Sequence, residues 1–446
     1  MSSVCVRRAM GRVWFVLLVL VVSASCAWAA AAKNVVLFIA DGAGFNSFHC
    51  AAYYEHGELG RQAYDAFEVK LACTTGAYGS PAYDPAKAWS DFRSHRVKAT
   101  DSAAAATALN TGVKTQNGRI SVDAEGRVLV TIAEIAAGLG KSTGAVTSVP
   151  FSHATPAAVF AHNTGRSNTR KIAEEIVYRS GLTVVFGAGH PAYDDEGKAL
   201  AREDWDTGYC SASVYEALAA GTTGRGWELV ETREAMEALA AAETCELRRV
   251  FGLVRNSSTL QYRRDGKRMG GLNEGVPTLE TMALAALNVL SADEDGFFLM
   301  VEGGAIDWAN HDKNLARMVE EFGDFNRTVA AVMRRLEQKG LLGETLVIVT
   351  ADHETGQLWG ENAGEKSATP FDLPKNRGKG VLPAAKHFSS GHTNVLVPLY
   401  ARGPGSEMFG GLVDGKDEKA AEAWGFSGEY VDNTEVFVVM KAAIAE

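Results

Sequence analysis

The sequence predicts an α/β fold, in which a mostly parallel central β-sheet is flanked by helices on both faces. Three short, continuous apolar runs have the length of buried strands, and each leads directly into acidic residues. Alanine-rich stretches with helical character separate these runs along the chain. The chain has 446 residues, of which 46% are hydrophobic and 22% charged, so it can bury a large core. Strands that alternate with helices in this way form parallel sheets covered on both sides.

The predicted strands share one pattern. They cover residues 34–40, 297–301 and 346–350. They lead into Asp41-Gly42, Glu302-Gly303-Gly304 and Asp352-His353, respectively. Parallel strands end at one edge of their sheet, and ligands bind beyond that edge, so we expect these side chains to converge there.

The remaining segments complete the predicted architecture. Helices are predicted at residues 103–109, 130–138, 279–290 and 314–342. The segment from about 194 to 268 breaks the alternation and is rich in Glu, Arg and Gly. We interpret it as an insertion in one catalytic domain, with a separate domain as the alternative. Residues 362–386 have the composition of a long polar loop.

The N-terminus has the three parts of a secretory signal. Arg7, Arg8 and Arg12 precede an apolar run at 13–22, and small residues end in Ala27-Trp28-Ala29. We expect residues 1–29 to be a signal peptide cleaved near Ala29, and residues 30–446 to be periplasmic or secreted. A membrane anchor is the alternative, but the apolar core is short for a bilayer. Lipid attachment at Cys26 is a second alternative.

Charge and cysteine content narrow the possibilities further. The net charge of −10 argues against a nucleic-acid or anionic-membrane binder that uses a basic surface. Four cysteines follow the predicted signal: Cys50, Cys73, Cys210 and Cys245. An oxidising compartment permits two disulfides, and proximity in sequence favours Cys50 with Cys73 and Cys210 with Cys245.

The acidic strand ends favour a metal centre. One strand-terminal aspartate is more often a turn or helix cap than a ligand. Here three such ends occur together with His311, four residues after Asp307, and with His392. Asp307, His311 and His392 mix oxygen and imidazole donors, as do Asp352 and His353, which suits zinc at two sites. Asp41, Thr155 and Glu302 are all oxygen donors, which suits magnesium.

Ser102 is the candidate nucleophile. Thr100-Asp101-Ser102 precedes four alanines, which places Ser102 at a helix N-terminus, where free amides and the helix dipole favour an alkoxide and a phosphate. The alternative is that Asp101 or Ser102 merely caps the helix, and without the metals this would be the better interpretation.

Several motifs together resemble those of the alkaline phosphatase family, in the family's order. They are Asp41-Gly42-Ala43-Gly44, Thr100-Asp101-Ser102-Ala103, His153-Ala154-Thr155-Pro156, Val301-Glu302-Gly303-Gly304-Ala305-Ile306-Asp307, Thr350-Ala351-Asp352-His353 and Gly391-His392-Thr393. Gly403-Pro404-Gly405 and Asp432-Asn433-Thr434 continue the likeness, which covers nearly the whole chain from Asn34.

The resemblance implies hydrolysis of phosphate monoesters through a phosphoserine at Ser102, with two zinc ions and one magnesium ion. Asp307, His311 and His392 would hold one zinc, and Asp352 and His353 the second, together with Asp41 and the serine oxygen. Asp41 would bridge to magnesium, which Thr155 and Glu302 complete. Arg166 would bind phosphate, with Arg170 as a less well matched competitor. The family is commonly dimeric, so a homodimer is possible.

Two positions depart from the form found in enteric bacteria. His153 and Trp308 stand where that form has an aspartate and a lysine, a combination that resembles other bacterial members. His153 is interpreted as a neighbour of the magnesium ligands, with a structural histidine or a direct ligand of zinc or cobalt as alternatives. Trp308 cannot hold phosphate by charge, so we expect faster product release.

Other functions share this scaffold. A phosphodiesterase, sulfatase or phosphomutase is the nearest alternative, and a phosphate-binding or structural protein without catalysis is another. The magnesium-type site favours small-molecule monoesters, and the complete set of nucleophile, arginine and ligands favours an enzyme.

Overall fold

The computed structural model describes residues 1, 31–206, 208–246, 248–260 and 273–445. The predicted signal peptide, including Cys26, therefore lies outside the described residues, apart from Met1. Among the helices that are described, none combines the length and the apolar character needed to cross a membrane.

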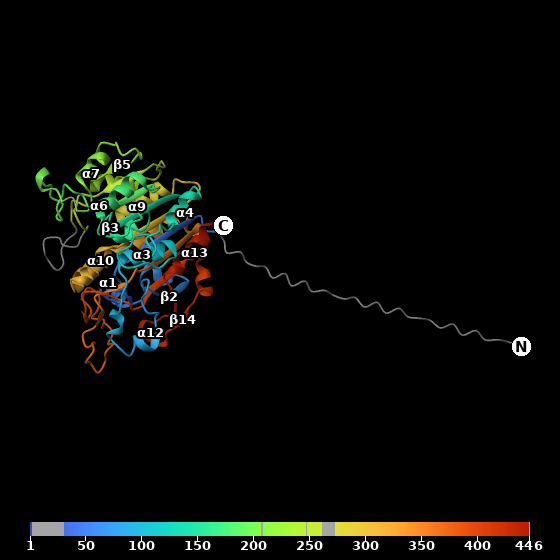
Figure 1. Ribbon diagram of the computed structural model, residues 1–446. Coiled ribbons are helices and arrows are strands. Elements are labelled where there is room, and N and C mark those ends of the chain that lie inside the picture. The colour runs from blue at the N-terminus through green and yellow to red at the C-terminus, as the bar shows by residue number, and fades with distance from the viewer. Residues whose placement is uncertain (2–30, 207, 247, 261–272, 446) are drawn as a thin grey trace.

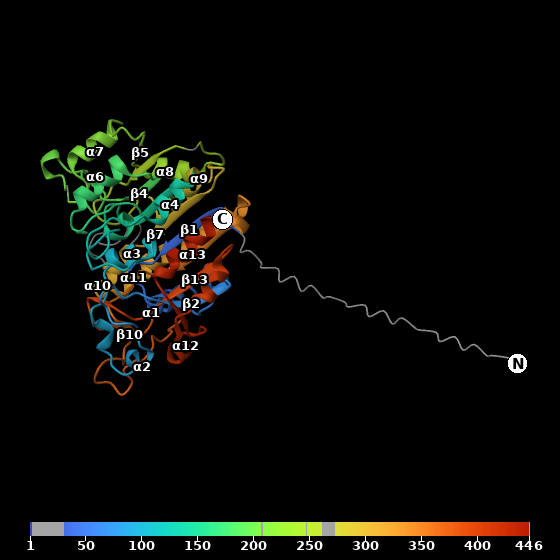
Figure 2. The same ribbon diagram turned by 45° about the vertical axis from the view of Figure 1, so that its right-hand side comes forward.

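A mixed, mostly parallel sheet forms the centre of the molecule, as predicted (Figures 1 and 2). In the described chain it has eleven strands, in the order β14 (Gly415–Lys416), β15 (Glu429–Asp432), β2 (Val69–Thr74), β13 (Val397–Arg402), β8 (Thr345–Thr350), β1 (Asn34–Ile39), β7 (Phe297–Glu302), β3 (Ser142–Pro150), β4 (Val184–Ala188), β6 (Val250–Leu253) and β5 (Glu228–Val230). Neighbours pair in parallel except where β13 meets β2 and β8 and where β14 meets β15.

The three predicted strands occupy the middle of this sheet. β1 pairs in parallel with β7 on one side and with β8 on the other, so that Val36 lies opposite Leu299 and Val347. Every residue of these three strands is buried. Burial on both faces explains why their sequences are continuous apolar runs and not alternating ones.

Two groups of helices flank the sheet. The first contains α1 (Phe45–His56), α8 (Arg233–Ala241), α9 (Leu279–Leu290), α10 (Ala305–His311) and α11 (Leu315–Gln338), which pack on one another. The second contains α3 (Ser102–Thr111), α4 (Ile132–Gly138), α5 (Ala154–Ala157) and α13 (Thr434–Ala445). The predicted helices correspond to α3, α4, α9 and α11. The other helices are α2 (Pro85–Ala88), α6 (Thr169–Arg179), α7 (Ala212–Ala219) and α12 (Glu418–Trp424).

The segment predicted as an insertion continues the central sheet. Its described part, which leaves out 207, 247 and 261–268, contains α7, β5, α8 and β6. β6 pairs with β4, and β5 pairs with β6. Two short antiparallel pairs lie outside the main sheet: β9 (Glu354–Thr355) with β12 (His392–Thr393), and β10 (Leu358–Gly360) with β11 (Ala385–His387). The predicted polar loop connects β10 to β11.

The predicted disulfide pairs are wrong for this structure. Cys50, Cys73, Cys210 and Cys245 are all free thiols. Proximity in sequence suggested the pairs, but Cys50 is buried on helix α1 and Cys73 is buried within strand β2, where each belongs to the hydrophobic core. Burial raises the pKa of the Cys210 thiol to about 12, so this side chain behaves as a small apolar core residue.

Candidate active site

Neighbouring parallel strands bring the acidic residues to one edge of the sheet. β8, β1, β7 and β3 lie side by side and run in the same direction. Glu302 is the last residue of β7, whereas Asp41 follows β1 and Asp352-His353 follows β8. All four side chains are fully buried. The topology therefore creates the convergence that the sequence pattern predicted.

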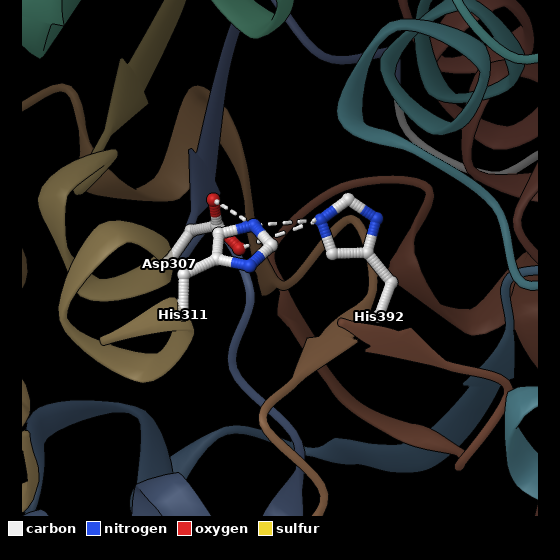
Figure 3. A group of neighbouring side chains, drawn as sticks. All are labelled: Asp307, His311 and His392. Atoms are coloured by element: carbon white, nitrogen blue, oxygen red, sulfur yellow. Dashed lines mark hydrogen bonds and ion pairs between the residues drawn. The ribbon is translucent and has the colours of Figure 1, made fainter. Parts of the chain in front are cut away.

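One group of possible metal ligands consists of Asp307, His311 and His392 (Figure 3). Asp307 and His311 lie one turn apart on α10, and His311 Nε2 is 3.3 Å from Asp307 Oδ2. His392 arrives on β12, and its Nε2 is 3.0 Å from His311 Nε2. Two imidazoles and one carboxylate thus point toward a common centre, with ligand atoms within 4.8 Å of one another.

A second group consists of Asp41, Asp352 and His353, again with ligand atoms within 4.8 Å. His353 Nε2 lies 3.2 Å from Asp352 Oδ2 and 3.8 Å from Asp41 Oδ1. The Gly42 amide donates to Asp352 Oδ1 at 3.0 Å, which fixes the carboxylate. Gly42 has φ +72°, and a Cβ at this position would lie 2.6 Å from Asp307 Oδ1, so glycine lets the turn after β1 approach α10.

A third set of oxygen donors lies beside Asp41. The Thr155 hydroxyl donates to Asp41 Oδ2 at 3.2 Å, and Glu302 accepts a short hydrogen bond from Thr147. Three carboxylate oxygens in this region, Asp41 Oδ1, Glu302 Oε1 and Asp352 Oδ2, are buried without a hydrogen-bond donor among the described residues. Such atoms are costly unless a cation offsets their charge.

The raised pKa values of the buried carboxyl groups also fit a site for cations. Burial and the neighbouring Asp352 and Asp307 carboxylates raise the pKa of Asp41 well above its usual range. Burial also raises the pKa of Glu302 and of Asp352 to about 7. Carboxylates that resist ionisation until neutral pH without metal would ionise readily beside divalent cations.

In the first group, the pKa values of His311 and Asp307 are shifted by each other. Burial lowers the pKa of His311, but the hydrogen bond and charge of Asp307 outweigh it and raise this pKa to about 9. Burial opposes ionisation of Asp307 too, yet its pKa is held well below the usual range by His311 and the other imidazoles. The donor types, the unpartnered oxygens and this mutual compensation all fit divalent cations, with mixed nitrogen and oxygen ligands in two groups and oxygen ligands in the third.

Ser102 is held against the second group. It is the first residue of α3, and Asp101 caps this helix by accepting from the Ala104 amide at 3.0 Å. Ser102 Oγ lies 3.2 Å from His353 Nε2. Every residue of α3 before the C-terminal Thr111 is almost completely buried. This burial explains the alanine run, because small side chains let the helix pack within the core.

Arg166 reaches the same place from another segment. Its Nη1 donates to Asp101 Oδ2 at 3.1 Å, and its Nη2 lies 3.3 Å from His153 Nε2. The guanidinium is thus oriented by Asp101, the residue that precedes Ser102. Arg170, the competing arginine, is the second residue of α6.

His153 and Trp308 lie together at this site. Their ring centroids are 5.5 Å apart in an edge-to-face arrangement, and His153 precedes α5, which carries Thr155. Burial and the charge of Arg166 lower the pKa of His153 to about 3, so this imidazole is neutral at working pH.

Two supporting residues were missed by sequence reasoning. Thr147, inside β3, binds Glu302, and the Thr355 hydroxyl donates to Asp307 Oδ1 at 2.6 Å and lies 3.3 Å from His353 Nδ1. Thr147 lies in a strand that also contains Thr143 and Ser148, so nothing in the sequence distinguishes it from the other hydroxyl residues. Thr355 is only two residues after His353, and this spacing was a usable clue.

Comparisons with known proteins match this chain to a single family. A model of the alkaline phosphatase family matches residues 32–380. The alkaline phosphatase of Escherichia coli (strain K12) is 30% identical over 443 residues, covering 93% of this chain and 86% of the relative. Alkaline phosphatase 4 of Bacillus subtilis (strain 168) is 30% identical over 379 residues, covering 72% and 75%. A solved cold-active alkaline phosphatase from the psychrophile Shewanella sp. matches with a TM-score of 0.65 and 24% identity, over 93% of this chain and 100% of that one.

Proposed function

The chain belongs to the alkaline phosphatase family and is a phosphomonoester hydrolase, and from this membership we propose that it acts through a phosphoserine at Ser102 with two zinc ions and one magnesium ion. The N-terminal pattern further supports export of the mature enzyme to the periplasm or the medium.

The ligand sets follow the three groups of donors. Asp307, His311 and His392 would hold one zinc. Asp352 and His353 would hold the other together with Asp41, which Thr155 and Glu302 join around magnesium. When bound, these ions supply Lewis-acid stabilisation of oxygen charge and favour deprotonation of coordinated hydroxyl groups.

Ser102 forms the covalent bond. Its oxygen attacks phosphorus in line with the ester oxygen, the bond to that oxygen breaks, and the alcohol leaves. Water then hydrolyses the phosphoserine and releases inorganic phosphate. The helix N-terminus at Ser102 adds free amides that favour the negative charge on the transferring group.

Arg166 binds the phosphoryl group. Its planar guanidinium suits two nonbridging oxygens, and Asp101 and His153 hold it in orientation. The neutral His153 leaves the positive charge of the guanidinium available for phosphate.

One observation carries this proposal: Ser102 Oγ lies 3.2 Å from His353 Nε2, within the group that Asp41 and Asp352 complete. A nucleophile against a candidate metal group is what two-step phosphoryl transfer requires, whereas a simple helix cap has no need of it.

Hydrolysis of p-nitrophenyl phosphate by the mature protein tests the reaction class. We expect activity that rises from neutral to alkaline pH, disappears with chelator and returns with zinc and magnesium. Bis-p-nitrophenyl phosphate and p-nitrophenyl sulfate serve as controls. Preference for either control substrate would move the chain to a sibling activity, and no turnover with full metal occupancy would favour a binding protein.

Ser102→Ala tests the intermediate. We expect turnover to fall by at least about a thousandfold, because the covalent step is lost, and the phosphorylated enzyme to disappear on acid quench. Ser142→Ala is a matched control, since Ser142 is a buried serine at the start of β3 that bonds the Leu290 carbonyl. Near wild-type turnover in Ser102→Ala would refute the nucleophile.

A further inference from the structure

Thr107 has an unusual hydrogen-bonding pattern for a helical threonine. It lies in α3, the helix that Ser102 begins, and it is fully buried. Helical threonines commonly bond the carbonyl of the preceding turn, as Thr111 does to the Thr107 carbonyl at 2.7 Å. The Thr107 hydroxyl instead leaves its helix. It donates to the Arg119 carbonyl at 3.1 Å and accepts from the Ser121 amide at 2.9 Å.

The segment that Thr107 holds also carries the backbone of Arg166. We call residues 118–121 the bracing segment. Ile120 and Asn163 exchange two backbone hydrogen bonds of 2.8 and 2.9 Å, and the Arg166 amide donates to the Gly118 carbonyl at 2.7 Å. The Thr107 hydroxyl is therefore connected to the backbone of Arg166 through the bracing segment. The Asp101 carboxylate supports the same arrangement from the other side, because its Oδ2 accepts from the Gly118 amide at 2.9 Å as well as from the Arg166 guanidinium.

The bracing segment has a strained residue at the point of contact. Ser121 has φ +43°, a backbone conformation that residues other than glycine rarely adopt. Its amide is held by Thr107, and its hydroxyl donates to the Ala158 carbonyl at 2.8 Å. Strain of this kind persists only where surrounding contacts enforce it. Without the Thr107 hydroxyl, the Ser121 amide and the Arg119 carbonyl would lose their partner and the segment would relax.

We propose that Thr107 is a positioning residue that fixes Arg166 relative to Ser102, by joining the nucleophile's helix to the bracing segment. This inference rests on the proposed phosphate-binding role of Arg166. The Asp101 carboxylate orients the guanidinium of Arg166, whereas Thr107 positions the backbone of Arg166 through the bracing segment.

Inhibition by inorganic phosphate tests the proposal in the enzyme supplied with zinc and magnesium. In Thr107→Val, which keeps the shape and removes the hydroxyl, we expect the inhibition constant for phosphate to rise and kcat/KM for p-nitrophenyl phosphate to fall, each about tenfold, because small misplacements are costly in such sites. Thr107→Ser should restore both. Thr111→Val makes the same change one turn later on α3. It should alter the inhibition constant and kcat/KM by less than about twofold, which is the size of effect expected at a site that does not couple to Arg166. If Thr107→Val does not fold, Thr107→Ala takes its place.

A double-mutant cycle with Arg166→Ala separates positioning from general damage. If Thr107 acts through Arg166, Thr107→Val should have almost no further effect in the Arg166→Ala background. Equal effects in both backgrounds, or no effect of Thr107→Val in the native enzyme, would overturn the proposal. If Arg166→Ala itself leaves phosphate inhibition unchanged, the proposed role of Arg166 fails, and that outcome is distinguishable because it does not involve Thr107.

Discussion

At the level of single residues, Trp308 and His153 lie together beside Arg166, the residue that we propose to bind phosphate. Trp308 lies on α10, next to Asp307 in the chain, and packs edge-to-face on His153. His153 is neutral because burial and Arg166 lower its pKa to about 3. Neither side chain contributes positive charge at neutral pH, so under the proposed function Arg166 supplies the attraction for product phosphate on this side of the site.

Trp308→Lys should therefore tighten phosphate inhibition. We expect the inhibition constant for phosphate to fall by about tenfold, as one more charge-assisted contact would provide, with slower turnover if release becomes limiting. Steady-state inhibition of p-nitrophenyl phosphate hydrolysis by inorganic phosphate measures this constant. Trp308→Met is the control, since it removes the ring without adding charge. If the lysine and methionine variants bind phosphate equally, product release does not depend on charge at this position.

Short turns and hairpins decide how the site elements meet. The β9 and β12 pair places His392 opposite Thr355, two residues after His353, so that the His353 and His392 rings stack with centroids 3.8 Å apart. The turn after β1 brings Gly42 against α10, where its carbonyl accepts from Asn310 Nδ2 at 3.0 Å. These contacts join three elements whose residues are far apart in the chain.

Gly42→Ala tests the close approach of this turn. A methyl group would meet both the side chain and the backbone of Asp307, and φ is +72°. We expect unfolding in urea to show a loss of about 3 kcal/mol or more, together with reduced zinc content. Gly60→Ala is a matched control, because Gly60 has φ +81° and no atom within 4 Å of the added Cβ. Equal losses in the two variants would mean that backbone strain alone, and not contact with Asp307, limits this position.

At the level of the whole molecule, the sheet gathers negative charge into its own interior. Asp41, Glu302, Asp307 and Asp352 are buried beyond the ends of adjacent central strands. Glu302 ends β7, Asp41 and Asp352 follow β1 and β8, and Asp307 lies on α10, so repulsion among these carboxylates acts on elements of the core and on global stability. Cations bound there would stabilise the native state by mass action.

Chelation should therefore lower stability, and more so as pH rises. The pKa of His311 is raised to about 9, so its contribution is complete below pH 6.5 and is lost as pH rises toward 9. The pKa values of Glu302 and Asp352 are raised to about 7, so these carboxyls oppose folding increasingly as pH rises toward 7, and the fall in stability above pH 7 comes from His311. We expect the thermal midpoint of the chelated protein to fall between pH 6.5 and 9, while that of the metal-loaded protein changes little. Parallel curves with and without chelator would show that these residues do not bind the ions.

The central strands, the main helices and the candidate metal ligands were all recognisable in the amino-acid sequence. Buried parallel strands are recognisable because burial on both faces requires continuous apolar residues, and the acidic residues at their ends stand out against that background. Asp307 and His311 could be paired because one helical turn separates them. The alanines of α3 signalled a helix within the core.

The contacts between distant segments could be read only from the folded chain. The prediction of disulfide pairs was wrong because proximity in sequence does not determine which side chains meet. Cys50 lies on a helix and Cys73 on a strand, and the fold keeps both as free thiols. The tie from Thr107 to the bracing segment, and the support that Thr147 and Thr355 give to the carboxylates, come from ordinary threonines in apolar or polar surroundings. Hydrogen bonds of this kind depend on distance and direction in space, and only the packed fold fixes those.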